Sequence, residues 1–200
     1  METKQRCAWC EKDDLYRNYH DNEWGKPVYD DETIFEFLIL ETFQAGLSWY
    51  TVLAKRENFR KAFDNFNLIK IANYSEDKMA ELAEDAGIIR NKLKIKATVT
   101  NAQAFIKVQE EFGTFSKYIW GFVDGKPIDN QPKILGEVKA TTPISDALSK
   151  DLKKRGFKFV GSTVMYAHMQ ATGMVNDHIL ECFTRKYKFC QLPTKKKIKL

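Results

Sequence analysis

The chain has 200 residues, of which 44% are hydrophobic and 13% aromatic, so it can form one domain with a buried core or two small lobes that share an interface. It has no apolar run near the ~20 residues that a membrane-spanning helix needs, and its first residues lack the apolar stretch of a signal peptide. We therefore expect a cytoplasmic protein without a membrane partner, whose four cysteines are thiols or metal ligands rather than disulfides.

The net charge of +5 is concentrated at the C-terminus. Four of these charges belong to Lys195, Lys196, Lys197 and Lys199, which leaves only +1 for the rest of the chain. We expect residues 191–200 to form a disordered basic tail. An argument for nucleic-acid binding must then rest on local basic groups, and on charge alone each of these is equally compatible with a solvated helix face. The two candidates are Lys92, Lys94 and Lys96, and the set Lys150, Lys153, Lys154, Arg155 and Lys158.

Helical periodicity runs through the first half of the chain. An aspartate at position 30 or 31 can cap a helix that carries apolar residues to Phe43 and is broken at Gly46. Ser48 can cap the next helix, which includes Phe59, and a short helix begins near Asn67. The pattern predicts a chain of consecutive helices joined by short connections.

The second half continues this pattern. Ser75 can cap a helix that ends at Gly87, and a long helix follows over residues 91–111. Residues 124–143 contain three prolines and two glycines and are expected to be a loop. Ser145 can cap a helix to residue 155, and a last helix fits residues 162–172. No alternating run is long enough for a substantial sheet, and the absence of a G-x-G-x-x-G or Walker motif disfavours nucleotide-cofactor enzymes.

Glu41 stands out because the helix around it is strongly apolar. Glutamate is rarely buried without a partner, so this carboxyl group lies either on the solvent side of the helix or in a cavity. Its position alone favours the solvent side. A few residues later, the turn at Gly46 and Leu47 could expose an apolar side chain at a loop tip, which becomes important only if that side chain enters a DNA stack.

The segment around Gly87 reads as helix, tight hairpin and helix. Such a hairpin can offer backbone N–H groups to a phosphate, and Lys92 can contact the same phosphate without reading sequence. The pattern is weak by itself, because any joint between two helices that contains a glycine looks similar.

Two Cys/His pairs occur at opposite ends of the chain. Cys7 and His20 lie near the N-terminus, and His178 and Cys182 have the i, i+4 spacing that places both side chains on one face of a helix. Together they could form one tetrahedral metal site, although four unrelated buried residues would give the same pattern. Cys10 forms a C-x-x-C with Cys7 and leaves open which thiol would bind. His168 has no thiol near it and is interpreted as a core histidine.

Several segments resemble the bacterial type I 3-methyladenine-DNA glycosylases. The matching segments are YRNYHDNEWG at residues 16–25, QAGLSW at 44–49, TVL at 51–53, KREN at 55–58, DAGIIR at 85–90, KKRGFKFVG at 153–161 and VNDH at 175–178. They run in order from Cys7 to Cys182, nearly the whole chain. Cys10, Cys190 and the lysine tail fall outside the resemblance.

The resemblance implies an all-α fold of the helix-hairpin-helix DNA glycosylase superfamily. We expect residues 1–190 to form one glycosylase domain of two helical lobes, with the helix-hairpin-helix lobe at about residues 65–140 and the termini in the other lobe. The resemblance also implies a structural Zn²⁺ that joins the terminal segments and is held by Cys7, His20, His178 and Cys182. A closed set of four ligands would argue against a zinc-dependent hydrolase, which needs an open coordination position.

For function, the resemblance implies a monofunctional enzyme of base-excision repair. It would flip 3-methyladenine out of alkylated double-stranded DNA, hydrolyse the N-glycosidic bond, and release free 3-methyladenine as product. Glu41 would hydrogen-bond the flipped base, and Leu47, preceded by Gly46, would fill the gap in the duplex. Gly87 and Lys92 would bind the DNA backbone. The aromatic residues expected to stack on or enclose the base are Tyr16, Tyr19, Trp24 and Trp49.

The chemistry fits these residue types. Methylation at N3 makes the purine cationic, so it can leave without prior protonation, and an aromatic pocket favours a cation. An ionised Glu41 would add to that preference. Two alternatives remain. One is a DNA-binding module of the same fold without catalysis. The other is a glycosylase of related fold that acts on oxidised or mismatched bases; its bifunctional versions need a lysine nucleophile, for which Lys92 is the nearest candidate. The sequence carries no signal for oligomerisation, and we take a monomer as the default.

Overall fold

The computed structural model describes residues 4–188, which are mostly helical, as the sequence predicts. The α-helices are α1 (Asp14–Asn22), α2 (Asp31–Gln44), α3 (Trp49–Ala54), α4 (Arg56–Ala62), α5 (Leu68–Ala72), α6 (Glu76–Glu84), α7 (Lys92–Phe112), α8 (Phe115–Trp120), α9 (Pro143–Lys154), α10 (Ser162–Ala171) and α11 (Phe183–Lys188). Short 3-10 helices cover Ala8–Cys10, Asp64–Phe66, Gly121–Val123 and Leu135–Glu137. Cys190 and the predicted tail lie outside the described residues.

The two strands of the described chain form only a minimal sheet. β1 (Ile128–Asp129) and β2 (Val175–Asn176) pair in parallel over two residues each. This pairing joins the long loop before α9 to the segment after α10. Among the described helices, none combines the length and apolarity that crossing a bilayer requires.

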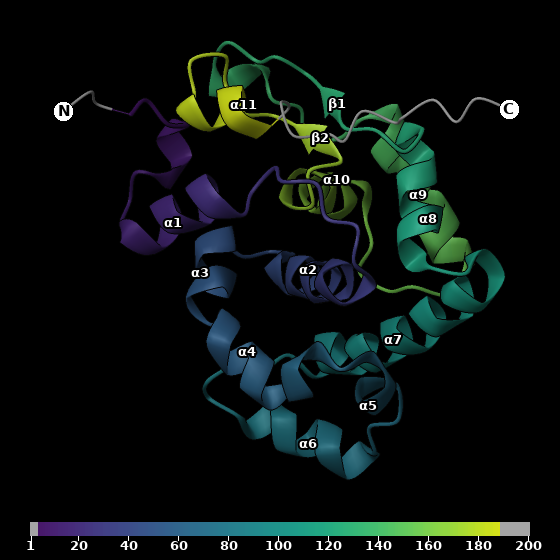
Figure 1. Cartoon of the computed structure of the whole chain (residues 1–200). Coiled ribbons are helices and arrows are strands. Elements are labelled where there is room, and N and C mark those ends of the chain that lie inside the picture. The colour runs from purple at the N-terminus through teal and green to yellow at the C-terminus, as the bar shows by residue number, and fades with distance from the viewer. Residues whose placement is uncertain (1–3, 189–200) are drawn as a thin grey trace, which may run out of the picture.

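Helix α2 lies at the centre of the molecule (Figure 1). It packs against α3, α7, α8 and α10, and nearly all of its side chains from Ile34 to Phe43 are buried. A helix that is apolar on all sides has no solvent face and must be surrounded by other elements. Because Glu41 belongs to this helix, the burial of the apolar residues around it places its carboxyl group in the interior.

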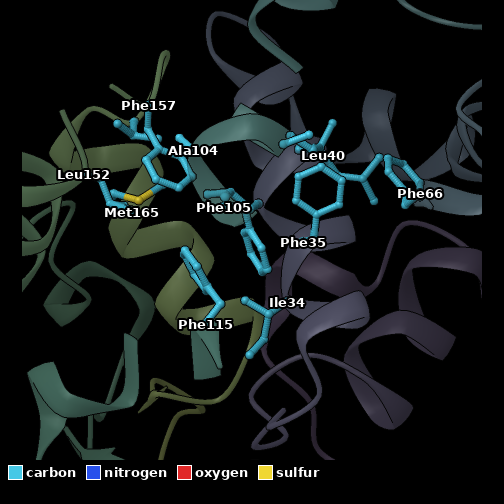
Figure 2. Close-up of a cluster of buried hydrophobic side chains, with 14 of the residues drawn as sticks. Ile34, Phe35, Leu40, Phe66, Ala104, Phe105, Phe115, Leu152, Phe157 and Met165 are labelled. Carbon is cyan, nitrogen blue, oxygen red and sulfur yellow. The ribbon is translucent and has the colours of Figure 1, made fainter. Parts of the chain in front are cut away.

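Aromatic rings in contact join α2 to the long helix α7 and to α8 (Figure 2). The rings of Phe105 and Phe115 stack with their centroids 3.9 Å apart, and Phe35 meets Phe105 edge-on at 5.2 Å. Each buried side chain of this size contributes roughly 1.5–3 kcal/mol relative to exposure. This core fixes α2 firmly enough to place a polar group from it at a defined position.

Most predicted helix starts are confirmed. The side chains of four residues accept backbone hydrogen bonds in the first turn of their helices, namely Asp30, Ser48, Asn67 and Ser75. The prediction of one helix from Ser48 to Phe59 is wrong, because the chain bends at Lys55 and forms α3 and α4 separately. The break places the Lys55 ammonium against the carbonyl oxygens of Ala86 and Gly87, each 3.1 Å away.

Two other predicted boundaries are also wrong. Helix α6 ends at Glu84 rather than Gly87, because Asp85 takes an extended conformation and its carboxylate accepts the Gly87 N–H at 2.7 Å. The cap of α9 is Thr142 rather than Ser145. Ser145 instead completes a capping box, in which its hydroxyl accepts the N–H of Thr142 at 2.8 Å.

The hairpin between α6 and α7 is tight. A Cβ atom on Gly87 would lie 2.9 Å from the Asp85 carboxylate and 3.4 Å from Asn58, so a side chain there would displace the carboxylate that accepts the Gly87 N–H. Asn58 also donates a hydrogen bond to the Gly87 carbonyl at 3.2 Å. The hairpin is therefore held from α4, which follows the bend at Lys55.

Lys94 differs from the two lysines near it. Its side chain is buried, and its ammonium donates to the carbonyl oxygens of Phe43 and Ala45 at 2.9 and 2.6 Å. Lys94 therefore satisfies the carbonyl groups at the C-terminal end of α2 and is removed from the candidate phosphate contacts. Lys92 and Lys96 remain exposed.

The two ends of the described chain meet. The backbone N–H of Phe183 donates to the Gln5 carbonyl at 2.9 Å, which places α11 beside the N-terminal segment. Figure 1 shows α4, α5, α6 and α7 on one side of α2, and α1, α10, α11 and the strand pair on the other. The proposed boundary of a hairpin lobe at residues 65–140 stays a prediction.

Replacement of Lys94 by methionine should destabilise the protein. Two carbonyl groups at the end of α2 would lose their buried donor, which should lower the free energy of unfolding by roughly 1–3 kcal/mol. Denaturant unfolding would measure the loss, with Lys96→Met, on the exposed face of the same helix, as the matched control. Equal stability of the two variants would contradict the capping role.

Candidate active site

A cavity of about 270 Å³ opens beside Glu41. It is walled by five aromatic residues, by polar residues of α2 and α10, and by the loop that follows residue 134. It is lined by Trp9, Tyr16, Tyr19, Trp24, Glu41, Gln44, Trp49, Leu135, Val138, Lys139, Ala167 and Gln170. The sequence analysis named four of the five rings and the carboxyl group, and the structure brings all of them together.

Trp9 lies at the centre of the aromatic wall. Its ring meets Tyr16 edge-on at 4.9 Å and Trp24 edge-on at 5.0 Å. On the other side, the rings of Tyr19 and Trp49 lie 5.3 Å apart. Edge-to-face contacts of this kind fix ring orientation beyond what burial alone would do. The wall is thus a packed set of rings whose positions depend on one another.

The carboxyl group of Glu41 is buried and its Oε2 atom has no hydrogen-bond partner among residues 4–188. The side chain is only 3% exposed, so the expectation from position alone, a solvent-facing carboxylate, is wrong. Burial raises the pKa of Glu41 to about 8, because the charged form loses its hydration. The group is therefore mainly protonated at neutral pH when the cavity holds no cation, in contrast to the ionised form considered from the sequence.

A second polar atom of the wall is also unpaired. The indole Nε1 of Trp49 is buried without a hydrogen-bond acceptor among the described residues. Burial also raises the pKa of Tyr16 to about 12, so its phenol keeps its proton. Buried polar atoms nearly always have partners, and those without one suggest a ligand. The cavity thus presents an acid and a ring N–H to whatever enters it.

Cys7, His20, His178 and Cys182 form one buried group, and their ligand atoms all lie within 4.8 Å of one another. The Cys182 sulfur lies 3.5 Å from His20 Nε2 and 3.5 Å from His178 Nδ1, and the Cys7 sulfur lies 3.7 Å from His178 Nδ1. The two pairs predicted from opposite ends of the chain do converge, but His178 and Cys182 precede α11 and do not lie on one face of a helix as predicted. This group could hold a metal ion.

The atoms around this group suit metal binding. His20 Nδ1 lies 2.8 Å from Asp21 Oδ1, and Asp21 is itself held by the Arg6 guanidinium at 2.9 Å. His178 Nε2 lies 3.2 Å from the carbonyl oxygen of Trp24. In both histidines one nitrogen thus faces an acceptor and the other faces the sulfurs, the arrangement usual for metal-bound imidazoles.

The structure separates Cys10 and His168 from this group. The Cys10 thiol donates to the Cys7 carbonyl at 3.1 Å, and burial raises its pKa to about 12. Cys10 therefore supports the turn that carries Cys7 and Trp9. Of the two cysteines in the C-x-x-C, Cys7 is the one that belongs to the four-residue group. His168 is fully buried in α10, as expected for a core residue, and burial lowers its pKa to about 3.

The residues predicted to contact DNA do not line the cavity. Gly46 has a φ of +81°, which favours glycine, and it places Leu47 with 43% of its surface exposed between α2 and α3. Gly87 lies in the hairpin, and Lys92 is the exposed first residue of α7. In the second basic group, Arg155 is paired with Glu111 and Asp151, so it is not a free cation.

Sequence reasoning missed several residues of the cavity wall. Trp9 lies between the two cysteines of the C-x-x-C, and that proximity was the only signal for it. Gln44 lies in a segment that had been singled out for its turn. Gln170 and Lys139 reach the cavity from α10 and from the long loop, and no local pattern marks either one.

Comparisons with known proteins agree with this geometry. Residues 9–185 match the family model described as methyladenine glycosylase. The chain is 49% identical to DNA-3-methyladenine glycosylase 1 of Escherichia coli (strain K12) over 178 residues, which covers 89% of this chain and 95% of that protein.

Solved structures with the same fold include two of 3-methyladenine DNA glycosylase I. One is 51% identical with a TM-score of 0.86 and covers 90% of this chain and 98% of the other. The second is a variant in complex with 3-methyladenine, 36% identical with a TM-score of 0.87, covering 90% of this chain and 96% of the other.

The raised pKa of Glu41 makes stability depend on pH. Between pH 4.5 and 8 the folded protein keeps a proton that the unfolded chain has released, so stability falls as pH rises through this window. Glu41→Gln cannot ionise and should gain stability relative to the wild type by about 4–5 kcal/mol at most across it. Denaturant unfolding at several pH values would measure this. A difference that stays constant with pH would show that Glu41 has an ordinary pKa.

Proposed function

This chain belongs to the methyladenine glycosylase family, and from that membership we propose that it is a DNA-3-methyladenine glycosylase of base-excision repair. It flips the damaged nucleotide out of alkylated double-stranded DNA and hydrolyses its N-glycosidic bond. The products are free 3-methyladenine and an abasic site, and the enzyme has no lyase activity.

The observation that carries this proposal is the ring-walled cavity with an unpaired acid. A protein that only bound DNA would need the hairpin and Leu47 but no such cavity. The lining of Tyr16, Tyr19, Trp24 and Trp49 offers faces and edges to a planar base, and aromatic stacking contributes roughly 1–3 kcal/mol per base. Trp9 joins this set as a ring that contacts Tyr16, Tyr19 and Trp24.

Base flipping explains the exposed turn between α2 and α3. An enzyme that acts on a glycosidic bond cannot reach it inside a duplex, and extrusion of the nucleotide costs a few kcal/mol. Leu47 is an apolar side chain at the tip of a turn, and it can fill the vacated space and offset part of that cost. Gly46 permits the turn.

The hairpin holds the DNA backbone. The backbone N–H groups at the start of α7 point out of the helix end, where an anion is favoured, and the exposed Lys92 adds a positive charge. Gly87 keeps the hairpin narrow enough for close approach. These contacts position the duplex without reading its sequence.

The charge of the lesion drives the reaction. 3-Methyladenine in DNA is cationic, so the glycosidic bond can break without a general acid to protonate the leaving purine. When the cation enters, its charge lowers the pKa of Glu41, the carboxyl group releases its proton to water, and a carboxylate then faces the cation. Neutral adenine would not do this, so the cavity favours the damaged base twice, through its rings and through Glu41.

The metal group is proposed to hold a structural Zn²⁺. For Zn–S and Zn–N bonds of ~2.3 and ~2.0 Å, tetrahedral geometry places sulfur and nitrogen ligand atoms about 3.5 Å apart. The Cys182 sulfur and both imidazoles meet that spacing, at 3.5 Å each. The ion would supply structural cross-linking only. It would hold the segment that carries Trp9 and Tyr16 against the segment after α10.

Incubation with methylated DNA, followed by identification of the released bases, tests the proposed function. The wild type should release 3-methyladenine. Glu41→Gln should weaken binding of the free base much more than Glu41→Asp, because only the second keeps an ionisable group. Full activity in both variants would remove Glu41 from its role, and trapping of the protein on abasic DNA by borohydride would reveal a lysine nucleophile.

Metal analysis of protein purified without chelators should find about one zinc per chain. Removal of the ion should lower the melting temperature, because the binding free energy of a structural ion contributes to folding. Cys182→Ser should reduce the zinc content, whereas Cys10→Ser should keep it and serves as the matched thiol control. Protein without zinc but with full stability would contradict the proposed site.

A further inference from the structure

Asp177 is a buried carboxyl group outside the metal group. It is only 3% exposed and accepts three hydrogen bonds from side chains. Asn130 Nδ2 donates to it at 2.7 Å, the Tyr166 hydroxyl at 2.8 Å and Gln170 Nε2 at 2.7 Å. These three hydrogen bonds offset the cost of burying the carboxyl group, and they also fix the orientation of the three donor side chains.

The contact with Asp177 fixes which way the Gln170 amide faces. A carboxylate can only accept hydrogen bonds, so the amide nitrogen of Gln170 must be the atom that faces it. The amide oxygen then points away, and no hydrogen bond reaches it from any other side chain or backbone group in the described part of the chain. Gln170 is half-buried and lines the cavity beside Glu41.

An oxygen in this position can recognise only a donor. At position 6 adenine carries an amino group that donates, whereas guanine and hypoxanthine carry an oxygen that accepts. A fixed acceptor facing an oxygen leaves two acceptors opposed and both unsatisfied. Sites built to pair with a particular polar group reject analogues that lack it far more strongly than apolar pockets do.

We propose that Gln170, oriented by Asp177, accepts a hydrogen bond from the 6-amino group of the base and selects 3-methyladenine over 3-methylpurines with a 6-oxygen. This inference rests on the proposed function and adds a specificity residue to it. Gln170 touches the base, and Asp177 acts through Gln170 as a positioning residue. Glu41 distinguishes bases by their charge, whereas Gln170 distinguishes an amino group from an oxygen at position 6.

Equilibrium binding of two free bases to the full chain tests this. 3-Methyladenine and 3-methylhypoxanthine share the ring and the N3-methyl group and differ in the substituent at position 6 and the ring proton that goes with it. Quenching of the cavity tryptophans would report the binding of both. In Gln170→Leu the affinity for 3-methyladenine should fall about tenfold, the size expected for one lost hydrogen bond. The affinity for 3-methylhypoxanthine should change less than about threefold. The preference of the wild type for 3-methyladenine should therefore shrink.

Asp177→Asn provides an independent variant. An asparagine can donate as well as accept, so the Gln170 amide is free to turn its nitrogen toward the cavity. The affinity for 3-methyladenine should fall and that for 3-methylhypoxanthine should rise. Gln103→Leu makes the same substitution on the exposed face of α7 and should leave both affinities unchanged. Zinc content and melting temperature would confirm that each variant is folded.

The outcomes distinguish the role of Gln170 from the proposed function itself. If the wild type binds 3-methyladenine and Gln170→Leu lowers both affinities equally, or neither, the role of Gln170 is overturned while the proposed function stands. If the wild type neither binds 3-methyladenine nor releases it from methylated DNA, the proposed function fails and this inference fails with it. If Asp177→Asn does not fold, the Gln170→Leu result decides alone.

Discussion

A carboxyl group without a partner, buried in a ring-walled cavity, is the constraint on which the rest of the site depends. Burial of an ionisable group costs free energy, and a fold keeps such a group only where something offsets that cost or where function requires it. Here α2 carries Glu41 into the interior, and the described neighbours leave its Oε2 atom unpaired. Under the proposed function, the partner would be a positive charge, which a methylated purine brings with it.

The rings that would receive this cation are assembled from distant parts of the chain. Trp9 and Tyr16 come from the N-terminal segment, Trp49 from α3, and Gln170 from α10. The Cys/His group and the backbone bond between Phe183 and Gln5 hold the N-terminal segment in place. The Cys/His group and the cavity are thus structurally connected, because the segment that supplies Cys7 also supplies Trp9.

Contacts between helix ends also position the elements that are proposed to face DNA. Lys94, just after the hairpin, satisfies the end of α2, and Lys55, at the bend before α4, holds the hairpin. The turn with Leu47 lies directly after the helix end that Lys94 caps. The proposed gap-filling side chain, the hairpin and the acid at the base are therefore set by contacts among a few adjoining helix ends.

Local interactions explain which parts could be predicted from the sequence. Asp30 and Ser75 cap helices through bonds to their own following backbone, so a short pattern suffices. The cap of α9 was misplaced because Thr142 and Ser145 form a reciprocal pair, and either could begin the helix. Neither α1 nor α8 was predicted from the sequence. Helix α8 has only six residues and is buried, so its stability depends on packing, which periodicity alone does not reveal.

The candidate site was likewise only partly predictable from the sequence. Glu41 was noticeable as an acid in an apolar helix, but its direction depended on which helices surround α2. Family resemblance supplied that direction, and the four metal-group residues likewise converge only in three dimensions. No sequence pattern marked Gln170. Its proposed role in selecting the base depends on the hydrogen bond to Asp177, which forms only in the folded structure.

Titration of the Glu41 carboxyl group, followed by carbon NMR with labelled glutamate, tests the central claim most directly. The account predicts a pKa near 8 in the free protein and a clearly lower one when 3-methyladenine fills the cavity. An ordinary pKa near 4.5 in the free protein, or a raised one that the base does not change, would contradict it.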